Sequence, residues 1–330
     1  MIKEPWFWRA DSPGAEAVGF MLSPLSALYD AGRRLKRATT RPERPPAPVV
    51  CIGNATVGGV GKTPFALMLA PLLAAHGFQP AFLTRGYGGR ESGPTRVDPV
   101  AHAAAAVGDE ALLLAAVAPT VVAKDRAAGA RFAASLGADA VIMDDGFQNP
   151  AVEKAFSILL IDAADAGGRL LPAGPYREPL GEALARADAV VAVSDDDSAA
   201  AVPSAGGKPA FSAFLAPQIS GAGARAVAFC GIGRPARFFA ALKRADYAVV
   251  GERSFPDHHV YARAEIDGLR REAREKSAAL LTTAKDFARL PQNLREGVQV
   301  FPVVMKVDDP ARLTALVAAA AHAYGGRRHV

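Results

Sequence analysis

Short apolar runs alternate with longer amphipathic stretches along most of this chain. Residues 49–52, 80–84 and 140–143 have the length and the apolar character of buried strands. Residues 65–75, which follow the first run after a glycine-rich turn, have the length of a helix. Strands that alternate with helices predict a mostly parallel sheet with helices on both faces. We therefore expect an α/β fold whose ligands bind at the carboxyl ends of the strands.

The same pattern divides the chain into three parts. We expect an N-terminal segment over residues 1–47, a larger α/β domain over 48–205, and a linker with a second, smaller α/β domain over 206–330. The Pro/Ser/Gly-rich run that follows the acidic residues 195–197 is interpreted as a solvated boundary between the two domains. We expect the second α/β unit to begin at 226–233, with strands at 247–250, 279–282 and 300–304 and a last helix at 310–324.

The N-terminal segment differs from the rest. Both tryptophans lie in Trp6–Trp8, and the basic run 33–37 follows a set of apolar residues. Those apolar residues recur at helical spacing, at Val18, Leu22, Leu25 and Tyr29. Aromatic anchors, an apolar stripe and a basic end predict a helix that lies in a membrane interface. The alternative is a helix that packs its stripe on its own domain, and Pro24 argues against one continuous helix.

Composition narrows the classes of partner. The 330 residues include 38 Lys and Arg against 33 Asp and Glu, which gives a net charge of +5. This balance suits an anionic substrate or an anionic membrane surface, but it is too mild and too dispersed to predict nucleic-acid binding. Cys51 and Cys230 are far apart and lie in expected strands, so we expect a reducing compartment and no disulfide. No run of about 18 uninterrupted apolar residues predicts a membrane-spanning helix.

The loop after the first strand has the features of a phosphate-binding loop. Its glycines have no Cβ, so their amides can close around phosphate oxygens, and the start of the following helix adds partial positive charge. Lys62 can reach the β- and γ-phosphates, and the Thr63 hydroxyl can bind Mg²⁺. The general P-loop pattern has glycine where this chain has Thr56. The sequence predicts a nucleotide site in the larger domain, formed by Thr56, Val57, Gly58, Gly59, Val60, Gly61, Lys62 and Thr63.

Phosphoryl transfer needs further groups. Asp144 and Asp145 close the strand at 140–143, where carboxylates that hold Mg²⁺ are expected. Transfer to a hydroxyl also needs a base, for which Asp109 and one histidine of the pair His258 and His259 are candidates. Carboxylates at strand ends also serve as helix caps, and most histidines are surface or structural residues, so these bland interpretations remain open.

Seven motifs together resemble the tetraacyldisaccharide 4′-kinase family of lipid A biosynthesis. They are GNATVGGVGKTP (53–64), TRGYG (84–88), GDE (108–110), DDGFQ (144–148), LPAGPYREP (171–179), FPDHH (255–259) and TTAKD (282–286). They stand in the family's order, and the family's loop also has threonine at the position of Thr56. The resemblance implies a kinase that uses ATP and Mg²⁺ to phosphorylate the 4′-hydroxyl of a lipid-anchored tetraacyldisaccharide 1-phosphate, giving lipid IVA.

The resemblance also implies roles for individual residues. Asp109 would be the base, supported by His258 from the second domain, although the sequence does not decide between His258 and His259. Asp144 and Asp145 would form or adjoin the metal shell. The residues expected on the substrate or nucleotide side are Arg85, Tyr87, Glu110, Arg126, Gln148, Arg177 and Glu178.

The implied setting is the cytoplasmic face of the bacterial inner membrane, with an anionic surface and no obligate protein partner. Two alternatives remain. One is a P-loop GTPase or ATPase switch at the membrane surface, although the guanine-reading sequence Asn-Lys-x-Asp is absent. The other is a membrane-surface binding module with a degenerate nucleotide fold.

Overall fold

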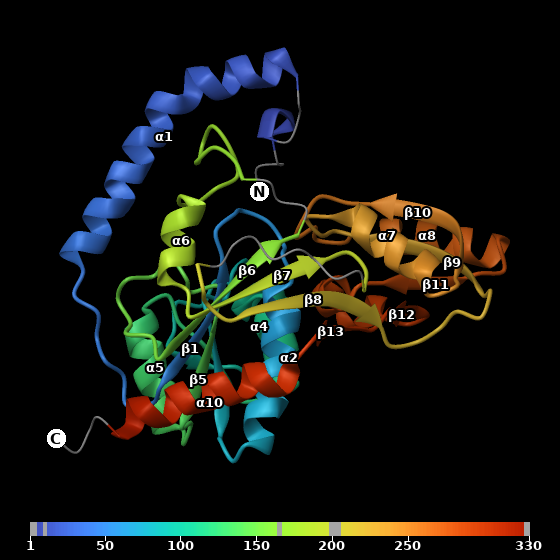
Figure 1. Cartoon of the computed structure of the whole chain (residues 1–330). Helices are drawn as coiled ribbons and strands as arrows, with labels where there is room; N and C mark the ends of the chain where they lie inside the picture. The colour runs from blue at the N-terminus through green and yellow to red at the C-terminus, as the bar shows by residue number, and fades with distance from the viewer. Residues whose placement is uncertain (1–4, 9–11, 164–166, 198–205, 327–330) are drawn as a thin grey trace.

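A computed structural model describes residues 5–8, 12–163, 167–197 and 206–326. The chain forms two sheets, each covered by helices, and a long N-terminal helix that stands to one side (Figure 1). The expected domain boundary near residue 205 lies outside the described residues, as do residues 1–4 and 9–11 of the expected N-terminal segment.

The larger sheet has nine strands. Their bounds are β1 (Val49–Asn54), β2 (Pro80–Thr84), β3 (Thr95–Arg96), β4 (Thr120–Val122), β5 (Ala140–Asp144), β6 (Phe156–Asp162), β7 (Ala189–Ser194), β8 (Ala210–Pro217) and β13 (Val303–Val307). The strand order is β13-β8-β7-β6-β1-β5-β2-β4-β3. All neighbouring pairs are parallel except β13 with β8 and β3 with β4. The expected mostly parallel α/β sheet is confirmed.

Helices cover both faces of this sheet. α2 (Lys62–Ala75) and α10 (Pro310–Gly326) lie on one face, and α5 (Arg126–Ser135) and α6 (Leu180–Arg186) on the other (Figure 1). Side chains of β1 alternate between the two cores: Val50 and Ile52 pack with α2, whereas Val49 and Cys51 pack with the opposite layer. The whole strand is buried, which explains its unbroken apolar sequence and fixes the position of the loop that follows it.

The smaller sheet has four parallel strands in the order β10-β9-β11-β12. They are β9 (Arg225–Cys230), β10 (Ala248–Ser254), β11 (Ala279–Thr282) and β12 (Val298–Val300). The helices of this domain are α7 (Pro235–Arg244), α8 (Arg263–Glu275) and α9 (Ala284–Arg289), with a 3-10 turn, η2 (Gln292–Leu294), before β12. α3 (Ala104–Val107) and α4 (Asp109–Ala115) belong to the larger domain, and α4 and α9 contact each other.

The end of the chain departs from the expected division. The strand expected at 300–304 is wrong, because β12 and β13 are separate strands of different sheets. Pro302, which has no amide to donate, lies between them, while Phe301 is buried in the core of the smaller sheet and Met305 in that of the larger. The expected unit at 206–330 is therefore divided: β8, β13 and α10 return to the larger sheet.

The N-terminal helix α1 (Pro13–Thr39) is continuous, although Pro24 argued against one continuous helix. Because proline has no amide hydrogen, Pro24 leaves the carbonyl of Phe20 without its helical donor. Both residues are exposed, so water can reach this carbonyl. The helix follows the short turn η1 (Trp6–Trp8) and touches the larger domain at few points, where Ser26 Oγ donates to the Leu170 carbonyl over 2.9 Å. Within the described residues, no helix combines the length and apolar character needed to cross a bilayer.

Candidate active site

The loop between β1 and α2 leaves a row of backbone amides free. Gly61 is the N-cap of α2 and has a φ of 93°, in the left-handed region that glycine tolerates. No side chain caps this helix, and the amides of residues 58–63 have no hydrogen-bond partner in the described part of the chain. Free amides and the positive end of the helix together form an anion site.

The first two residues of the predicted loop have a different environment. The amide of Val57 donates to the carbonyl of Pro175 over 2.8 Å, and the buried Thr56 accepts a hydrogen bond from Asn54 Nδ2 through its carbonyl, over 2.9 Å. These two residues therefore shape the loop, whereas those after them form the anion site. Asn54 Oδ1 also accepts from the ammonium of Lys62 over 2.9 Å, a positioning contact that the sequence analysis missed.

The acidic pair that ends β5 faces the start of α2. Thr63 Oγ1 donates to Asp144 Oδ2 over 3.0 Å, while Asp144 Oδ1 is buried without a hydrogen-bond partner among the described residues. Burial, together with the charge of Glu110, raises the pKa of Asp144 to about 7. A threonine hydroxyl beside an unpartnered carboxylate oxygen suits a divalent cation, which would favour the ionised form of Asp144.

Asp145 is held by two cations. Lys62 Nζ lies 3.5 Å and Arg177 Nη1 lies 2.9 Å from Asp145 Oδ1. Burial alone would raise the pKa of Asp145, but the charges of Lys62 and Arg177 lower it to about 2. Asp145 is therefore ionised at neutral pH and keeps the Lys62 ammonium beside the loop, so the two adjacent aspartates have different environments.

A second cluster lies where α4 meets the smaller domain. Gly108 precedes Asp109 with a φ of 89°, and a Cβ on this glycine would lie 2.6 Å from the carbonyl oxygen of Tyr87. Asp109 is 3% exposed; its Oδ1 lies 3.5 Å from His258 Nδ1 and its Oδ2 lies 2.6 Å from Arg289 Nη2. Burial alone would raise the pKa of Asp109, but the hydrogen bond from His258 and the charge of Arg289 lower it below its ordinary value.

His258, and not His259, contacts the predicted base. The ring of Tyr87 packs on His258 with 5.1 Å between centroids, so both predicted residues lie at this cluster. His259 instead lies 2.9 Å from the carboxylate of Glu265 and stacks on Phe255 at 4.7 Å. The geometry therefore favours His258, the choice that the sequence left open.

Arg289 is a site residue that the sequence analysis missed. It lies on α9, its side chain is 7% exposed, and it binds Asp286 over 2.9 Å as well as Asp109. Lys285, one turn earlier on the same helix, forms an ion pair with Glu110. The TTAKD motif gave a signal for the start of α9, but it ends before Arg289.

Three residues predicted on the substrate side lie beside the phosphate loop. Gln148 Nε2 donates to Glu178 over 2.9 Å and to the carbonyl of Asn54 over 2.8 Å. Arg177 binds Asp145, as described above. These residues come from the segments after β5 and before α6, and the structure brings them together at the carboxyl edge of the sheet.

The other predicted substrate residues come from different elements. Glu110 is already paired with Lys285, and Arg126 is buried and donates to the carbonyl of Ala123 over 2.6 Å. Burial lowers the pKa of Arg126 to about 10. Arg85 is exposed at the end of β2.

A free-amide loop with Lys62 and Thr63, a strand-end aspartate pair and a buried carboxylate across a domain junction define a P-loop phosphotransferase. The family model for tetraacyldisaccharide-1-P 4′-kinase (LpxK) matches residues 18–322. The chain belongs to this family. The expected family, fold class and assignment as an ATP-dependent 4′-kinase are confirmed, and the GTPase alternative is not favoured.

Individual relatives agree with this assignment. A tetraacyldisaccharide 4′-kinase from Paramagnetospirillum magneticum is 47% identical over 323 residues, covering 96% of this chain and 98% of the relative. One from Methylobacterium sp. strain 4-46 is 46% identical over 328 residues, with 96% and 98% coverage. The crystal structure of the "apo" form of LpxK from Aquifex aeolicus in complex with ATP matches with a TM-score of 0.76 and 29% identity, covering 92% of this chain and 99% of that one.

Proposed function

We propose that this chain holds ATP on the loop at 58–63 and transfers its γ-phosphoryl group to the 4′-hydroxyl of a tetraacyldisaccharide 1-phosphate, giving lipid IVA. The single observation that supports this most is the row of unpartnered loop amides beside Lys62. Amides fixed before the nucleotide arrives stabilise the transferring phosphates without reorganisation. The Lys62 ammonium, held by Asn54 and Asp145, adds the charge that the β- and γ-phosphates require.

The residues at the start of α2 fit Mg²⁺. The Thr63 hydroxyl and the carboxylate of Asp144 would hold the ion, and Asp145 adjoins them. Within the described residues, no group of three or more His, Cys, Asp or Glu could hold a metal, so phosphates and water would have to complete the coordination of this ion. The ion would neutralise negative charge on the β- and γ-phosphates.

Asp109 is proposed as the base. Its carboxylate accepts the proton of the 4′-hydroxyl while that oxygen forms a bond to the γ-phosphorus, and the bond to the β–γ bridging oxygen breaks with ADP as the leaving group. Its lowered pKa makes it a weak base, but the transition state of phosphoryl transfer is loose, so position matters more than basicity. His258 and Arg289 fix that position.

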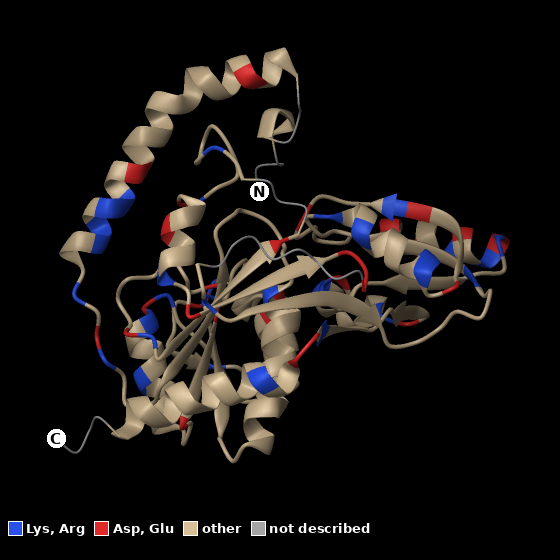
Figure 2. Ribbon diagram, in the orientation of Figure 1, with Lys and Arg blue, Asp and Glu red and all other residues tan. Residues whose placement is uncertain are grey.

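We propose that α1 brings the enzyme to the cytoplasmic face of the inner membrane, where the acyl chains of the acceptor are anchored. Phe20, Met21 and Leu28 on this helix are 76%, 77% and 71% exposed, an arrangement that favours membrane insertion over packing on the domain. Basic residues gather toward its C-terminal end (Figure 2). A basic residue near an anionic surface contributes roughly 1 kcal/mol.

An assay of nucleotide turnover tests the proposal. Purified protein is incubated with ATP or GTP, each with and without the acyl-disaccharide 1-phosphate, and nucleoside diphosphate is measured. ATP turnover that depends on the acceptor is expected. GTP-selective hydrolysis that is indifferent to the lipid would support the switch, and the absence of turnover would support the binding module.

A further inference from the structure

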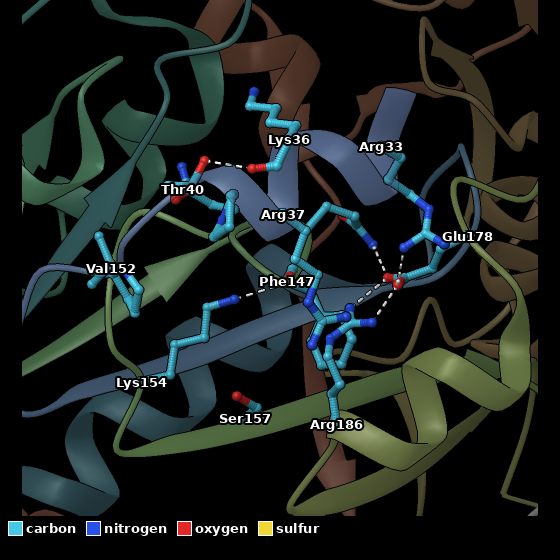
Figure 3. Close-up of a pocket in the computed structure, with 14 residues that line it drawn as sticks. Arg33, Lys36, Arg37, Thr40, Phe147, Val152, Lys154, Ser157, Glu178 and Arg186 are labelled. Atoms are coloured by element: carbon cyan, nitrogen blue, oxygen red, sulfur yellow. Dashed lines mark hydrogen bonds and ion pairs between the residues drawn. The ribbon is translucent and has the colours of Figure 1, made fainter. Parts of the chain in front are cut away.

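A cavity of about 470 Å³ lies between the C-terminal part of α1, the segment from β5 to β6, and α6 (Figure 3). Five of the charged side chains that line it are cationic and one is anionic, a formal charge of +4: Arg33, Lys36, Arg37, Lys154, Arg186 and Glu178. The phosphoryl-transfer chemistry described above does not use these cations.

Two of the cations are already neutralised. Glu178 is buried, and its carboxylate lies 2.6 Å from Arg186 and 3.7 Å from Arg33. Arg33 also binds Asp30 over 2.5 Å and Glu182 over 2.7 Å. The surplus positive charge of the cavity therefore comes from its other cations.

Lys154 and Arg37 face the cavity without a counter-ion. Lys154 Nζ donates to the carbonyl of Phe147 over 2.8 Å and lies 5.7 Å from the centre of its ring, but it contacts no carboxylate in the described part of the chain. For Arg37, neither a hydrogen bond nor an ion pair is found among the described residues. Burial lowers the pKa of both side chains, and the charge of Arg186 adds to the effect. Such cations favour the entry of an anion.

We propose that this cavity is a second anion site, separate from the loop at 58–63, which binds the phosphate group of a membrane-borne lipid. A phosphate group offers several acceptor oxygens to lysine and arginine donors from different elements, such as Lys154 and Arg37 (Figure 3). The cavity lies under the basic end of α1, the helix that the proposed function places at the bilayer. The inference rests on the proposed function only for the placement of α1 at the bilayer. It does not require that the protein transfers phosphate.

Two molecules carry this chemistry at the membrane. One is the acceptor itself, through its 1-phosphate; Gln148 lines the cavity and also donates to the carbonyl of Asn54, so the cavity adjoins the site of transfer. The other is an anionic phospholipid, because α1 forms one wall. The experiment distinguishes the two sources.

The first arm measures binding without turnover. Inorganic phosphate is titrated calorimetrically in the presence of saturating Mg·ADP, which occupies the loop at 58–63. The double variant Arg37→Gln/Lys154→Gln should bind phosphate at least tenfold more weakly than the wild type. The control Arg34→Gln removes a charge from the same helix but does not line the cavity, since Arg34 binds Asp30 and Glu182 instead, and its affinity should be unchanged.

The second arm measures the KM for the acceptor, with and without its 1-phosphate, in phosphatidylcholine vesicles with and without phosphatidylglycerol. If the KM of the double variant Arg37→Gln/Lys154→Gln is tenfold that of the wild type only for the 1-phosphorylated acceptor, the acceptor supplies the phosphate group that the cavity binds. If phosphatidylglycerol stimulates the wild type but not the double variant, the phospholipid supplies that phosphate group.

Wild-type phosphate affinity in the double variant would overturn the site even if the enzyme is active. Weakened phosphate binding in an enzyme without turnover would uphold the site while the proposed function fails. The ligand-free double variant should melt no lower than the wild type, because it loses cations that lack counter-ions. If the double variant folds poorly, the single variant Arg37→Gln, at the exposed rim of the cavity, should also bind phosphate more weakly than the wild type.

Discussion

Lys62 and Asp145 place a positive and a negative charge next to each other at the phosphate loop. The ammonium of Lys62 lies between Asn54 Oδ1 and the Asp145 carboxylate, so it is already in place before a nucleotide enters. Asp145 stays ionised because Lys62 and Arg177 lower its pKa to about 2. The neighbouring Asp144 has a raised pKa, and its Oδ1 has no hydrogen-bond partner among the described residues, so this oxygen is available to the proposed cation.

Lys62→Ala should lower kcat/KM for phosphotransfer at least about 100-fold, because one preorganised contact to a developing charge is typically worth about 2.7–4 kcal/mol. Lys306→Ala, which removes an exposed lysine of β13, should have no effect and serves as the matched control. Steady-state kinetics with the acyl-disaccharide acceptor measure both. Activity of Lys62→Ala near that of the wild type would remove the P-loop assignment.

Asp109→Asn should lower kcat by about 10²–10⁴, the usual contribution of a general base, while the Kd for ATP stays nearly constant. The amide keeps the size of the carboxylate, and Asp267→Asn on α8 is the control for a surface aspartate. Single-turnover kinetics and ATP titration separate the two effects. A variant that loses only ATP affinity would show that the base is elsewhere.

Some of these residues were accessible from the sequence and others were not. Lys62, Asp109 and Asp144 each stand in a local motif whose chemistry needs that residue type. Arg289 does not, because its partner Asp109 is 180 residues away and no local pattern marks such a contact. Asn54 stands in the motif at 53–64 without a role that the sequence assigns, and only its hydrogen bond with Lys62 reveals its positioning role.

At the scale of elements, α1 is held by contacts on one side only. Ser26 Oγ of α1 and the Trp8 indole of the preceding turn η1 donate to carbonyls of the segment before α6, at Leu170 and Pro172. Its large apolar side chains remain exposed. A long helix with so much exposed apolar surface indicates an interaction site.

Replacing Phe20, Met21 and Leu28 with serine should reduce flotation of the protein with anionic vesicles several-fold, since burying each such side chain is worth roughly 1.5–3 kcal/mol. Activity on acceptor dispersed in detergent should be retained, because these three side chains are exposed and are not among the residues proposed for catalysis. Serine at Ala27, another exposed position of α1, is the control. Unchanged flotation of the triple variant would favour the packed-helix interpretation.

The helices and strands were predicted incorrectly where the outcome depends on solvent exposure or on packing against distant segments and not on the local sequence. Periodicity located α1 and most strands of both sheets, because buried strands have unbroken apolar sequences. Pro24 argued against one continuous helix, but the helix continues through this exposed position. The apolar run at 298–307 contains no signal that its two halves join different sheets, since that depends on which core each half packs against.

At the scale of the whole molecule, ion pairs join the two domains, and in each pair described below the larger domain contributes the acidic residue and the smaller domain the basic one. The larger domain contributes the acids Asp109 and Asp162, and the smaller one contributes Arg289 and Arg237, at 2.6 Å and 2.9 Å respectively. Glu110 pairs with Lys285 in the same sense. The proposed active site therefore lies at the junction of the domains, and Arg289 connects Asp109, the proposed base, to that junction.

Arg289→Gln should move the acidic limb of the pH profile of kcat/KM to higher pH. The pKa of Asp109 lies below its ordinary value of 3.8 partly because of Arg289; without that charge, burial raises it. Arg295→Gln, which lies in the same domain without contacting Asp109, is the control. Superimposable profiles for Arg289→Gln and the wild type would exclude this role.

The same pair should appear in the pH dependence of stability. A carboxylate with a depressed pKa stabilises the fold fully above its ordinary value of 3.8, and this contribution is lost as pH falls through the folded pKa. Losing one partner of a buried pair typically costs about 3–5 kcal/mol at neutral pH. Thermal denaturation from pH 3 to 7 should show a smaller loss on acidification for Arg289→Gln than for the wild type.

The most direct test of the central claim is to follow the terminal phosphate of ATP. Purified protein is given ATP labelled in its γ-phosphate and a tetraacyldisaccharide 1-phosphate in vesicles, and tandem mass spectrometry locates the label. Our account predicts labelled lipid with the new phosphate at the 4′ position, formed by the wild type and absent with Lys62→Ala. Label found only as inorganic phosphate, with the lipid unmodified, would contradict it.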